Sequence, residues 1–154
     1  MTTFNEQLCD FWKMFENGKK MVLSTSLDDY VTSRMMSIIQ MDGFLYFQTD
    51  KTFRKYEQLI KNRRVALCID NIQIEGICEE LGRPLENEAF VQNYKLYFAS
   101  SFERYTQLEN ERLFKVTPQY IKLWIYEEGK PFEKIFDIQR QKFDFIEYKG
   151  NGNL

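Results

Sequence analysis

Residues 30–55, YVTSRMMSIIQMDGFLYFQTDKTFRK, hold the strongest fold signal in the chain. Two runs rich in β-branched, aromatic and other apolar residues, 30–40 and 44–49, flank the dipeptide Asp42-Gly43. Between such runs, an Asp-Gly pair is the strongest short-range indication of a β-hairpin. The second run, FLYFQT, begins with four aromatic or aliphatic residues, so we expect this strand to be covered on both faces, as in the wall of a barrel.

Basic and hydroxyl-bearing residues are concentrated around this hairpin. Arg34 lies in its first strand, and the others follow its second strand, where residues 52–62 predict a helix: Thr49, Lys51, Thr52, Arg54 and Lys55. The N–H groups and the dipole at a helix N-terminus favour an anion. We therefore predict that Arg34 and this cluster converge on a cationic pocket that holds a phosphate. The inner side of the helix is expected to carry Phe53, Tyr56, Leu59 and Ile60.

The rest of the sequence predicts a single domain, 1–148, followed by a disordered tail, 149–154. Helices are expected at 3–17, where Thr3 and Glu6 form a capping box and Gly18 ends the helix, at 87–98 and at 102–110. Strands are expected at 21–26, 65–70, 72–81, 113–117, 120–126 and 132–137, with 138–148 as an edge strand or an arm on a partner. Gly76, inside a strand, indicates a bulge or a close backbone approach. This order favours the α+β class: a small antiparallel β-barrel with peripheral helices.

Composition excludes several kinds of function. A net charge of −2 disfavours binding of nucleic acid through a broad basic face. Because the chain has no histidine, serine-histidine and cysteine-histidine catalysis and most zinc sites are excluded. The three cysteines, Cys9, Cys68 and Cys78, form no CxxC pair and are interpreted as buried, reduced thiols. No apolar run approaches the roughly 20 residues that span a bilayer, and the N-terminus lacks a signal-peptide layout, so we predict a cytoplasmic protein without a membrane partner.

Several short motifs, taken in order, resemble the pyridoxamine 5′-phosphate oxidase family. They are Arg34-Met35-Met36, the Asp-Gly turn, Gln48-Thr49, Arg54-Lys55 and the run NRRVAL at 62–67. The resemblance covers residues 21–81 well and residues 116–124 more loosely. Members of this family are FMN-binding split β-barrels, usually homodimers with FMN at the subunit interface. The resemblance therefore implies a split barrel, FMN as cofactor and a homodimer.

The resemblance also implies which residues hold the phosphate of FMN. Arg34 matches the strand arginine that contacts this phosphate, and Arg54 and Lys55 match the basic pair that completes the site. Lys51 and Thr52 lie in the same cluster and are carried as further candidates. A lysine near a helix start, such as Lys55, can equally be a solvated surface residue, and the cluster is the reason for preferring phosphate contact.

A second group of positions is implied for the isoalloxazine ring. Met35, Met36 and Ser37 match strand residues that run beside the ring, and Gln48 and Thr49 match residues that meet its polar atoms. Asn71 and Trp124 match positions that approach the flavin. Two structural alternatives stay open: Asn71 can simply shape a turn, and Trp124 can belong to the core or to a dimer interface. Met35 and Met36 point to opposite faces of their strand, so only one side chain can face the ring.

Departures from the family limit the reaction that is expected. Ile39 stands where members often have lysine, and Phe53 stands where they have serine. The true oxidases grip their substrate with a C-terminal segment rich in arginine and histidine, whereas this chain has KPFEK at 130–134. Oxidation of pyridoxamine 5′-phosphate is therefore not expected.

The sequence leaves four functions to compare. The first is an FMN-dependent oxidoreductase of unknown substrate, with no catalytic residue assigned and with Tyr30, Glu75 and Lys134 as candidate substrate contacts. The second is a flavin-binding or flavin-sequestering protein without turnover. The third is a relative that binds the deazaflavin F420, although an acidic chain offers little support for its polyglutamate tail. The last is a structural or interaction domain without a cofactor.

Overall fold

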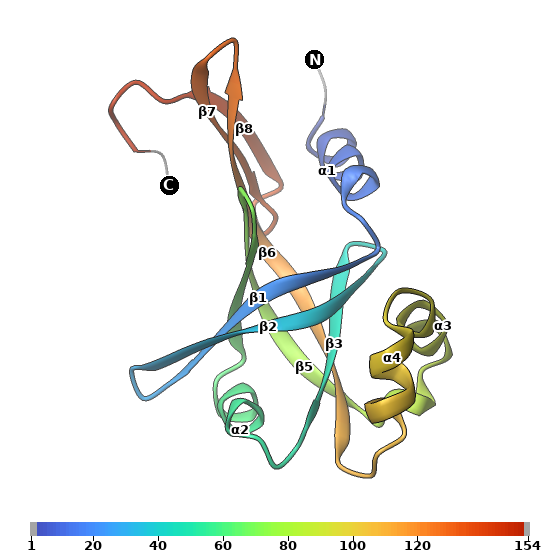
Figure 1. Ribbon diagram of the computed structural model, residues 1–154. Helices are drawn as coiled ribbons and strands as arrows, with labels where there is room; N and C mark the ends of the chain where they lie inside the picture. Colours follow the sequence, from blue (N-terminus) through green and yellow to red (C-terminus); the bar gives the residue numbers. More distant parts are fainter. Residues whose placement is uncertain (1–2, 153–154) are drawn as a thin grey trace.

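The computed structural model describes residues 3–152 and contains one antiparallel sheet that closes on itself. Its strands are β1 (Gly18–Leu27), β2 (Tyr30–Met41), β3 (Phe44–Asp50), β4 (Arg64–Ile69), β5 (Ile72–Gly82), β6 (Glu111–Glu127), β7 (Lys130–Asp137) and β8 (Lys142–Glu147). The order is β3-β2-β1-β4-β5-β6-β7-β8, and β3 also pairs with β6. This last pairing closes six strands into a barrel, and β7 and β8 extend beyond it (Figure 1).

Helices lie around the barrel and confirm the α+β class. They are α1 (Phe4–Met14), α2 (Arg54–Lys61), the 3₁₀ turn η1 (Pro84–Glu86), α3 (Glu88–Tyr97), the short α4 (Ala99–Ser101) and the π-helical turn η2 (Phe102–Thr106). Figure 1 shows α2 beneath one end of the barrel, α3 and α4 beside β3, and α1 near the β7–β8 hairpin. Among the residues that the structure describes, no helix is long and apolar enough to cross a membrane.

The two long hairpins both turn through residues with positive φ. Asp42 and Gly43 both have positive φ, 53° and 82°, and so do Asp28 and Asp29 at the β1–β2 turn, 51° and 66°. Two central residues with positive φ define the turn whose twist matches that of the flanking strands. The Asp42-Gly43 hairpin is therefore confirmed.

The core fills the barrel interior with the inward residues of alternating strands. On β1, Met21 and Leu23 are completely buried, and Phe47 of β3 stacks on Phe114 of β6 with ring centroids 5.4 Å apart. The helix α1 adds Phe11, whose ring lies 5.7 Å from that of Phe136 on β7. Strands β3 and β6 thus pack against each other as well as pairing, which fixes the geometry of the closing seam.

Gly76 marks a bulge, as the sequence indicates. The register of β5 and β6 shifts between Glu75 and Gly76, and a Cβ at Gly76 would lie 2.7 Å from the carbonyl oxygen of Thr117. The same irregularity explains why β6 runs through Pro118 as one strand of 17 residues, where two separate strands were expected. Proline is tolerated in a strand at a bulge because a ladder hydrogen bond is already interrupted there.

Two predictions about the helices are wrong in detail. The first helix ends at Met14, because Phe15 is extended and buried in the core. Gly18 instead begins β1, where a Cβ would clash with the ring of Tyr97 on α3. In α2, Leu59 is buried as predicted, and Gln58 is buried next to it.

Other predictions also need correction. Phe53 and Ile60, expected on the inner side of α2, are 53% and 48% exposed. Phe53 precedes the helix in an extended conformation and turns away from the core. Of the three free cysteines only Cys78 is buried, since Cys68 points outward from β4 and Cys9 is exposed on α1. The segment predicted as an edge strand or arm forms the edge strand β8, paired with β7. The predicted tail, 149–154, reaches beyond the described residues.

The N-terminal capping box predicts a measurable contribution to stability. Thr3 Oγ1 accepts a hydrogen bond from the Glu6 N–H at 3.1 Å, and Glu6 accepts one from the Thr3 N–H. Replacing Thr3 by alanine should lower the free energy of unfolding by about 1 kcal/mol in urea denaturation, since it removes an N-cap. The exposed Asn5→Ala control should change it by less than about 0.5 kcal/mol. Equal effects of the two changes would contradict the assignment of the cap.

Candidate functional site

The barrel is open along one side, between β2 and β3. These strands pair only over Ile39–Met41 and Phe44–Tyr46, next to their turn. Farther along, β2 pairs only with β1 and β3 pairs only with β6, each on its other edge, so the two strands diverge. Residues 34–38 and 47–50 therefore have no strand partner on the edges that face each other. Their peptide groups are available to hydrogen-bond something placed between the strands.

A cleft with a volume of about 430 Å³ occupies this split. Its walls come from β2, β3, the start of α2 and the segment from α3 to the beginning of β6. The lining residues are Met35, Met36, Ser37, Gln48, Thr49, Asp50, Phe53, Lys55, Tyr94, Tyr105, Leu108 and Glu111. Six of the residues predicted from sequence are among them: Met35, Met36, Ser37, Gln48, Thr49 and Lys55. As expected, Met35 and Met36 lie on opposite faces of β2, the first 58% and the second 9% exposed.

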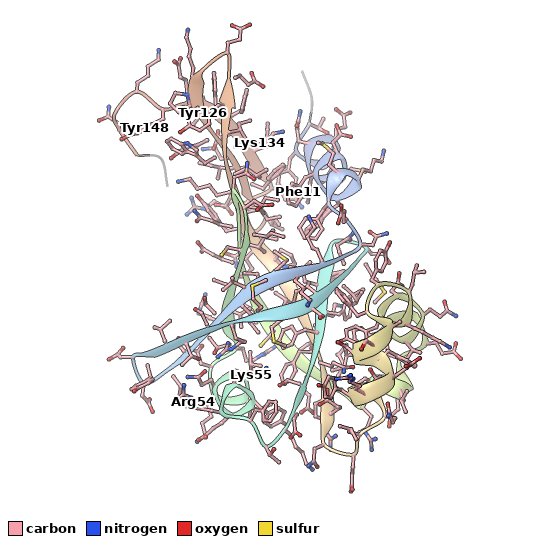
Figure 2. The ribbon with its side chains drawn as sticks, viewed as in Figure 1. Phe11, Arg54, Lys55, Tyr126, Lys134 and Tyr148 are labelled. Atoms are coloured by element: carbon pink, nitrogen blue, oxygen red, sulfur yellow. The ribbon has the colours of Figure 1, made fainter. Side chains whose placement is uncertain are left out.

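Three cations gather where the cleft meets the N-terminus of α2. Burial lowers the pKa of Lys55, and the charge of Arg34 lowers it further. Burial also lowers the pKa of Arg34, with a second contribution from Arg54. Figure 2 shows that Arg54 and Lys55 both project from the start of α2. Among residues 3–152, none of the three cations forms an ion pair with a carboxylate. Of the acidic groups in this described part of the chain, only Glu111 acts on Lys55, so the cluster carries a net positive charge.

Arg34 is held in place by a set of side chains at this end of the barrel. Its guanidinium donates to the Leu23 carbonyl at 3.1 Å, to Thr25 Oγ1 at 2.9 Å and to the hydroxyl of Thr32. Both threonine hydroxyls donate in turn to Gln58 Oε1, at 2.6 and 2.7 Å. Gln58 is only 4% exposed and belongs to α2. It therefore ties the helix that carries Arg54 and Lys55 to the strand that carries Arg34.

The loop before α2 places two of the predicted residues outside the cleft. The N–H and the hydroxyl of Thr52 donate to Asp50 Oδ1 at 2.8 and 2.7 Å. These hydrogen bonds, the side-chain bond first, lower the pKa of Asp50. Lys51 is exposed, and its N–H donates to the Asn110 carbonyl. The hydroxyl of Thr52 thus shapes the loop, and Lys51 lies beside it.

Three polar side chains of the cleft wall are buried. Gln48 is 7% exposed and accepts a hydrogen bond from Thr106 of η2 at 3.0 Å. The hydroxyl of Thr49 is buried and, among the described residues, has no hydrogen-bond partner. Glu111 is 6% exposed, and burial together with the charge of Asp50 raises its pKa to about 7. A buried hydroxyl without a partner needs one from outside the chain.

Asn71 and Trp124 lie at the other end of the β5–β6 ladder. Asn71 Nδ2 donates to the Trp124 carbonyl at 2.9 Å, and the Trp124 N–H donates to the Asn71 carbonyl at 3.2 Å. The ladder starts at Ile72 with Leu123 and reaches the cleft only at Gly82 with Leu113. The ring of Trp124 packs 5.4 Å from that of Tyr148. Within one chain these two residues do not join the cleft.

The three candidate substrate contacts also lie away from the cleft. Tyr30 is at the β1–β2 turn, where its ring lies 5.8 Å from the guanidinium of Arg54. Glu75 lines a separate cavity of about 450 Å³ on the outer face of β1, β4 and β5. Lys134 is on β7, and Figure 2 shows it far from Arg54 and Lys55.

Gln58 and Glu111 are among the residues of this site that the sequence did not indicate. Gln58 sits beside Leu59 in an amphipathic helix, and nothing in the spacing marks it as buried. Glu111 opens β6 directly opposite Asp50, a pairing that becomes visible only when the barrel closes. To place Glu111 opposite Asp50 from the sequence, one would have to predict how β3 and β6 align with each other.

Comparison with known proteins supports the fold. No protein-family model matches the chain, and no curated protein matches it significantly. Several solved structures, however, do match the chain. A pyridoxamine 5′-phosphate oxidase-related, FMN-binding protein from Nostoc punctiforme PCC 73102 has a TM-score of 0.59 and 13% identity, covering 93% of each chain.

Two further structures share this similarity. PhzG from Burkholderia lata 383, in complex with tetrahydrophenazine-1-carboxylic acid, has a TM-score of 0.63 and 13% identity, covering 93% of this chain and 91% of its own. An F420 reductase has a TM-score of 0.54 and 16% identity, covering 71% of this chain and 93% of its own. At these identities the similarity concerns the fold. The chain therefore has the six-stranded split-barrel fold of the pyridoxamine 5′-phosphate oxidase-related proteins.

Proposed function

We propose that the chain binds FMN, with the phosphate at Arg34, Arg54 and Lys55 and the isoalloxazine ring in the cleft between β2 and β3. The observation that carries this proposal is the unpaired cation cluster at the N-terminus of α2. A phosphate dianion is recognised by arginine in bidentate geometry and by lysine as a point charge. The first N–H groups of α2 add donors, because no side chain caps this helix.

The cleft next to the cations suits the flavin ring. Its volume of about 430 Å³ lies within the roughly 300–1,000 Å³ of small-molecule sites. The free edges of β2 and β3 offer peptide groups to the polar rim of a planar ring, and Thr49 offers a hydroxyl that lacks a partner. Met36 lies beside Lys55, with its sulfur 3.4 Å from Nζ, and supplies an apolar surface. The donor set therefore fits both parts of FMN.

A homodimer is part of the proposal. Asn71 and Trp124 can reach a cleft only if it belongs to a second copy, since both lie at the far end of β5 and β6. The outer face of the sheet supports such pairing, because Val31 and Met35 are 68% and 58% exposed there and Ala66 is exposed beside them. Light scattering should give a mass twice the 18.7 kDa of the chain, and a monomer would contradict this part of the proposal.

The reaction class that fits best is a flavin-dependent oxidation or reduction of a small molecule. FMN, when bound, supplies hydride and electron transfer. The chain's own residues position the ring, and Phe53, Tyr105 and Leu108 form an apolar wall on which a substrate can lie. No histidine is present, so a proton must be handled by a carboxyl, a lysine or a tyrosine.

The absorption spectrum of the purified protein tests the proposal. We expect flavin bands, release of FMN on heating identified by its mass, and rebinding of FMN by the stripped protein. Bleaching of the flavin by NADH or NADPH would support an oxidoreductase, whereas binding that no donor can bleach would support a sequestering role. Release of F420 would replace FMN by the deazaflavin. A colourless protein that takes up no FMN would overturn the proposal.

A further inference from the structure

Glu111 is a buried carboxyl group in the wall of the cleft, and the proposed phosphate contacts do not include it. It lines the cleft together with Lys55 and is 6% exposed. Among the described residues, no hydrogen bond or ion pair to its side chain is formed. Burial without a partner destabilises the charged form of a carboxyl group, so the group tends to take up a proton.

Titratable groups from four elements lie around Glu111. Asp50 on β3 is its direct partner in the β3–β6 ladder, and two carboxylates at opposed positions repel each other. Lys55 on α2 acts in the opposite sense and favours the charged form. Tyr94 on α3 and Tyr105 on η2 line the same cleft. Lys55 is thus the neighbouring group that favours the ionised form of Glu111.

The two carboxyl groups differ in their proton affinity. Hydrogen bonds from Thr52 hold the pKa of Asp50 below its ordinary value. Burial raises the pKa of Glu111 to about 7. A pair of carboxyls whose environments separate their pKa values in this way is the usual arrangement of an acid–base site. Asp50 stays charged near neutrality, while Glu111 can gain or lose its proton.

We propose that Glu111 is the acid–base group of the cleft, and that a phosphate bound to the cation cluster makes it take up one proton from solvent. The inference rests on the proposed binding of FMN phosphate at Arg34, Arg54 and Lys55. A phosphate dianion beside Lys55 cancels the one charge that favours ionised Glu111 and adds a negative charge nearby. The carboxylate becomes a carboxylic acid, which can donate a hydrogen bond or a proton to a ligand in the cleft.

Calorimetric titration with FMN at pH 8, in buffers of different ionisation enthalpy, measures this proton. At that pH the phosphate of free FMN, with a second pKa of about 6, is already a dianion and contributes little. The wild type should take up about one proton for each FMN bound. The Glu111→Gln variant should take up none, and the exposed Glu109→Gln variant should behave as the wild type.

Infrared spectroscopy provides a second, independent measurement of the same proton. The difference spectrum of the wild type with and without FMN should gain the band of a protonated carboxyl group, and Glu111→Gln should lack it. Proton uptake that persists in Glu111→Gln would assign the proton to another group and overturn the inference. If the wild type bound FMN without proton uptake and without the infrared band of a protonated carboxyl group, the inference would also be overturned. The proposed function would then remain intact. Absence of any FMN binding would instead contradict the proposed function.

Discussion

Replacing Arg34 by glutamine should weaken FMN binding roughly ten- to a hundredfold, which corresponds to about 1.5–3 kcal/mol. The change removes the cation that Leu23, Thr25 and Thr32 hold in place, and it leaves a neutral side chain at this position. Riboflavin lacks the phosphate, so its affinity should be the same for the variant and the wild type. The difference between FMN and riboflavin thus isolates the contribution of the phosphate.

Fluorescence titration of the stripped protein with each flavin measures both affinities. Arg140→Gln is the matched control, because it removes the same charge from a side chain that is 83% exposed at the β7–β8 turn. Its affinity for FMN should equal that of the wild type at moderate salt. If Arg34→Gln bound FMN as tightly as the wild type, or lost FMN and riboflavin affinity equally, the phosphate would have to lie elsewhere.

At pH 8 the Glu111→Gln variant should be more stable than the wild type by up to about 3 kcal/mol. The folded state raises the pKa of Glu111 from 4.5 to about 7, so the folded protein binds this proton more tightly than the unfolded chain. Below pH 4.5 the carboxyl group is neutral in both states and costs the folded protein no stability. As the pH rises toward and through 7, the wild type loses stability because the buried group must ionise. Glutamine stays neutral and avoids this loss.

Urea denaturation between pH 4 and pH 8 measures the difference in the free energy of unfolding. The advantage of Glu111→Gln should vanish at the acid end, grow between pH 4.5 and about 7, and then level off, because other titrating groups cancel between the two proteins. Glu109→Gln, with its exposed side chain, should stay within about 0.5 kcal/mol of the wild type throughout. A difference that does not depend on pH would show that folding leaves the pKa of Glu111 unchanged.

Local sequence signals predicted the parts of the site that are close together along the chain. The Asp-Gly turn fixes the β2–β3 hairpin, and the short loop that follows brings Arg54 and Lys55 to the same end of the barrel as Arg34. Such features depend on turn chemistry and on a helix start, both of which are written in a few neighbouring residues. The antiparallel barrel and its peripheral helices followed from the order of these elements.

The parts that the sequence did not predict depend on contacts between distant segments. Gln58 is buried because two threonines of the β1–β2 hairpin lie above it. Glu111 is buried because β6 pairs with β3 at Asp50. Phe53 and Ile60 misled the prediction for α2, since apolar residues beside a cleft or a subunit contact can face outward. Hydrophobic periodicity does not distinguish a residue that is buried in the core from an apolar residue that faces such a surface.

The seam between β3 and β6 also has a consequence for how the chain folds. It joins Asp50 to Glu111 across the loop that contains α2, β4, β5 and α3. Closing so long a loop costs entropy before its contacts can form, so we expect the seam to be among the slow steps. The β1–β2 hairpin, whose strands adjoin in sequence, should form earlier. A chain stalled before closure would present Arg34 without the opposite wall of the cleft, and ligand binding should therefore appear only in the slowest kinetic phase of refolding.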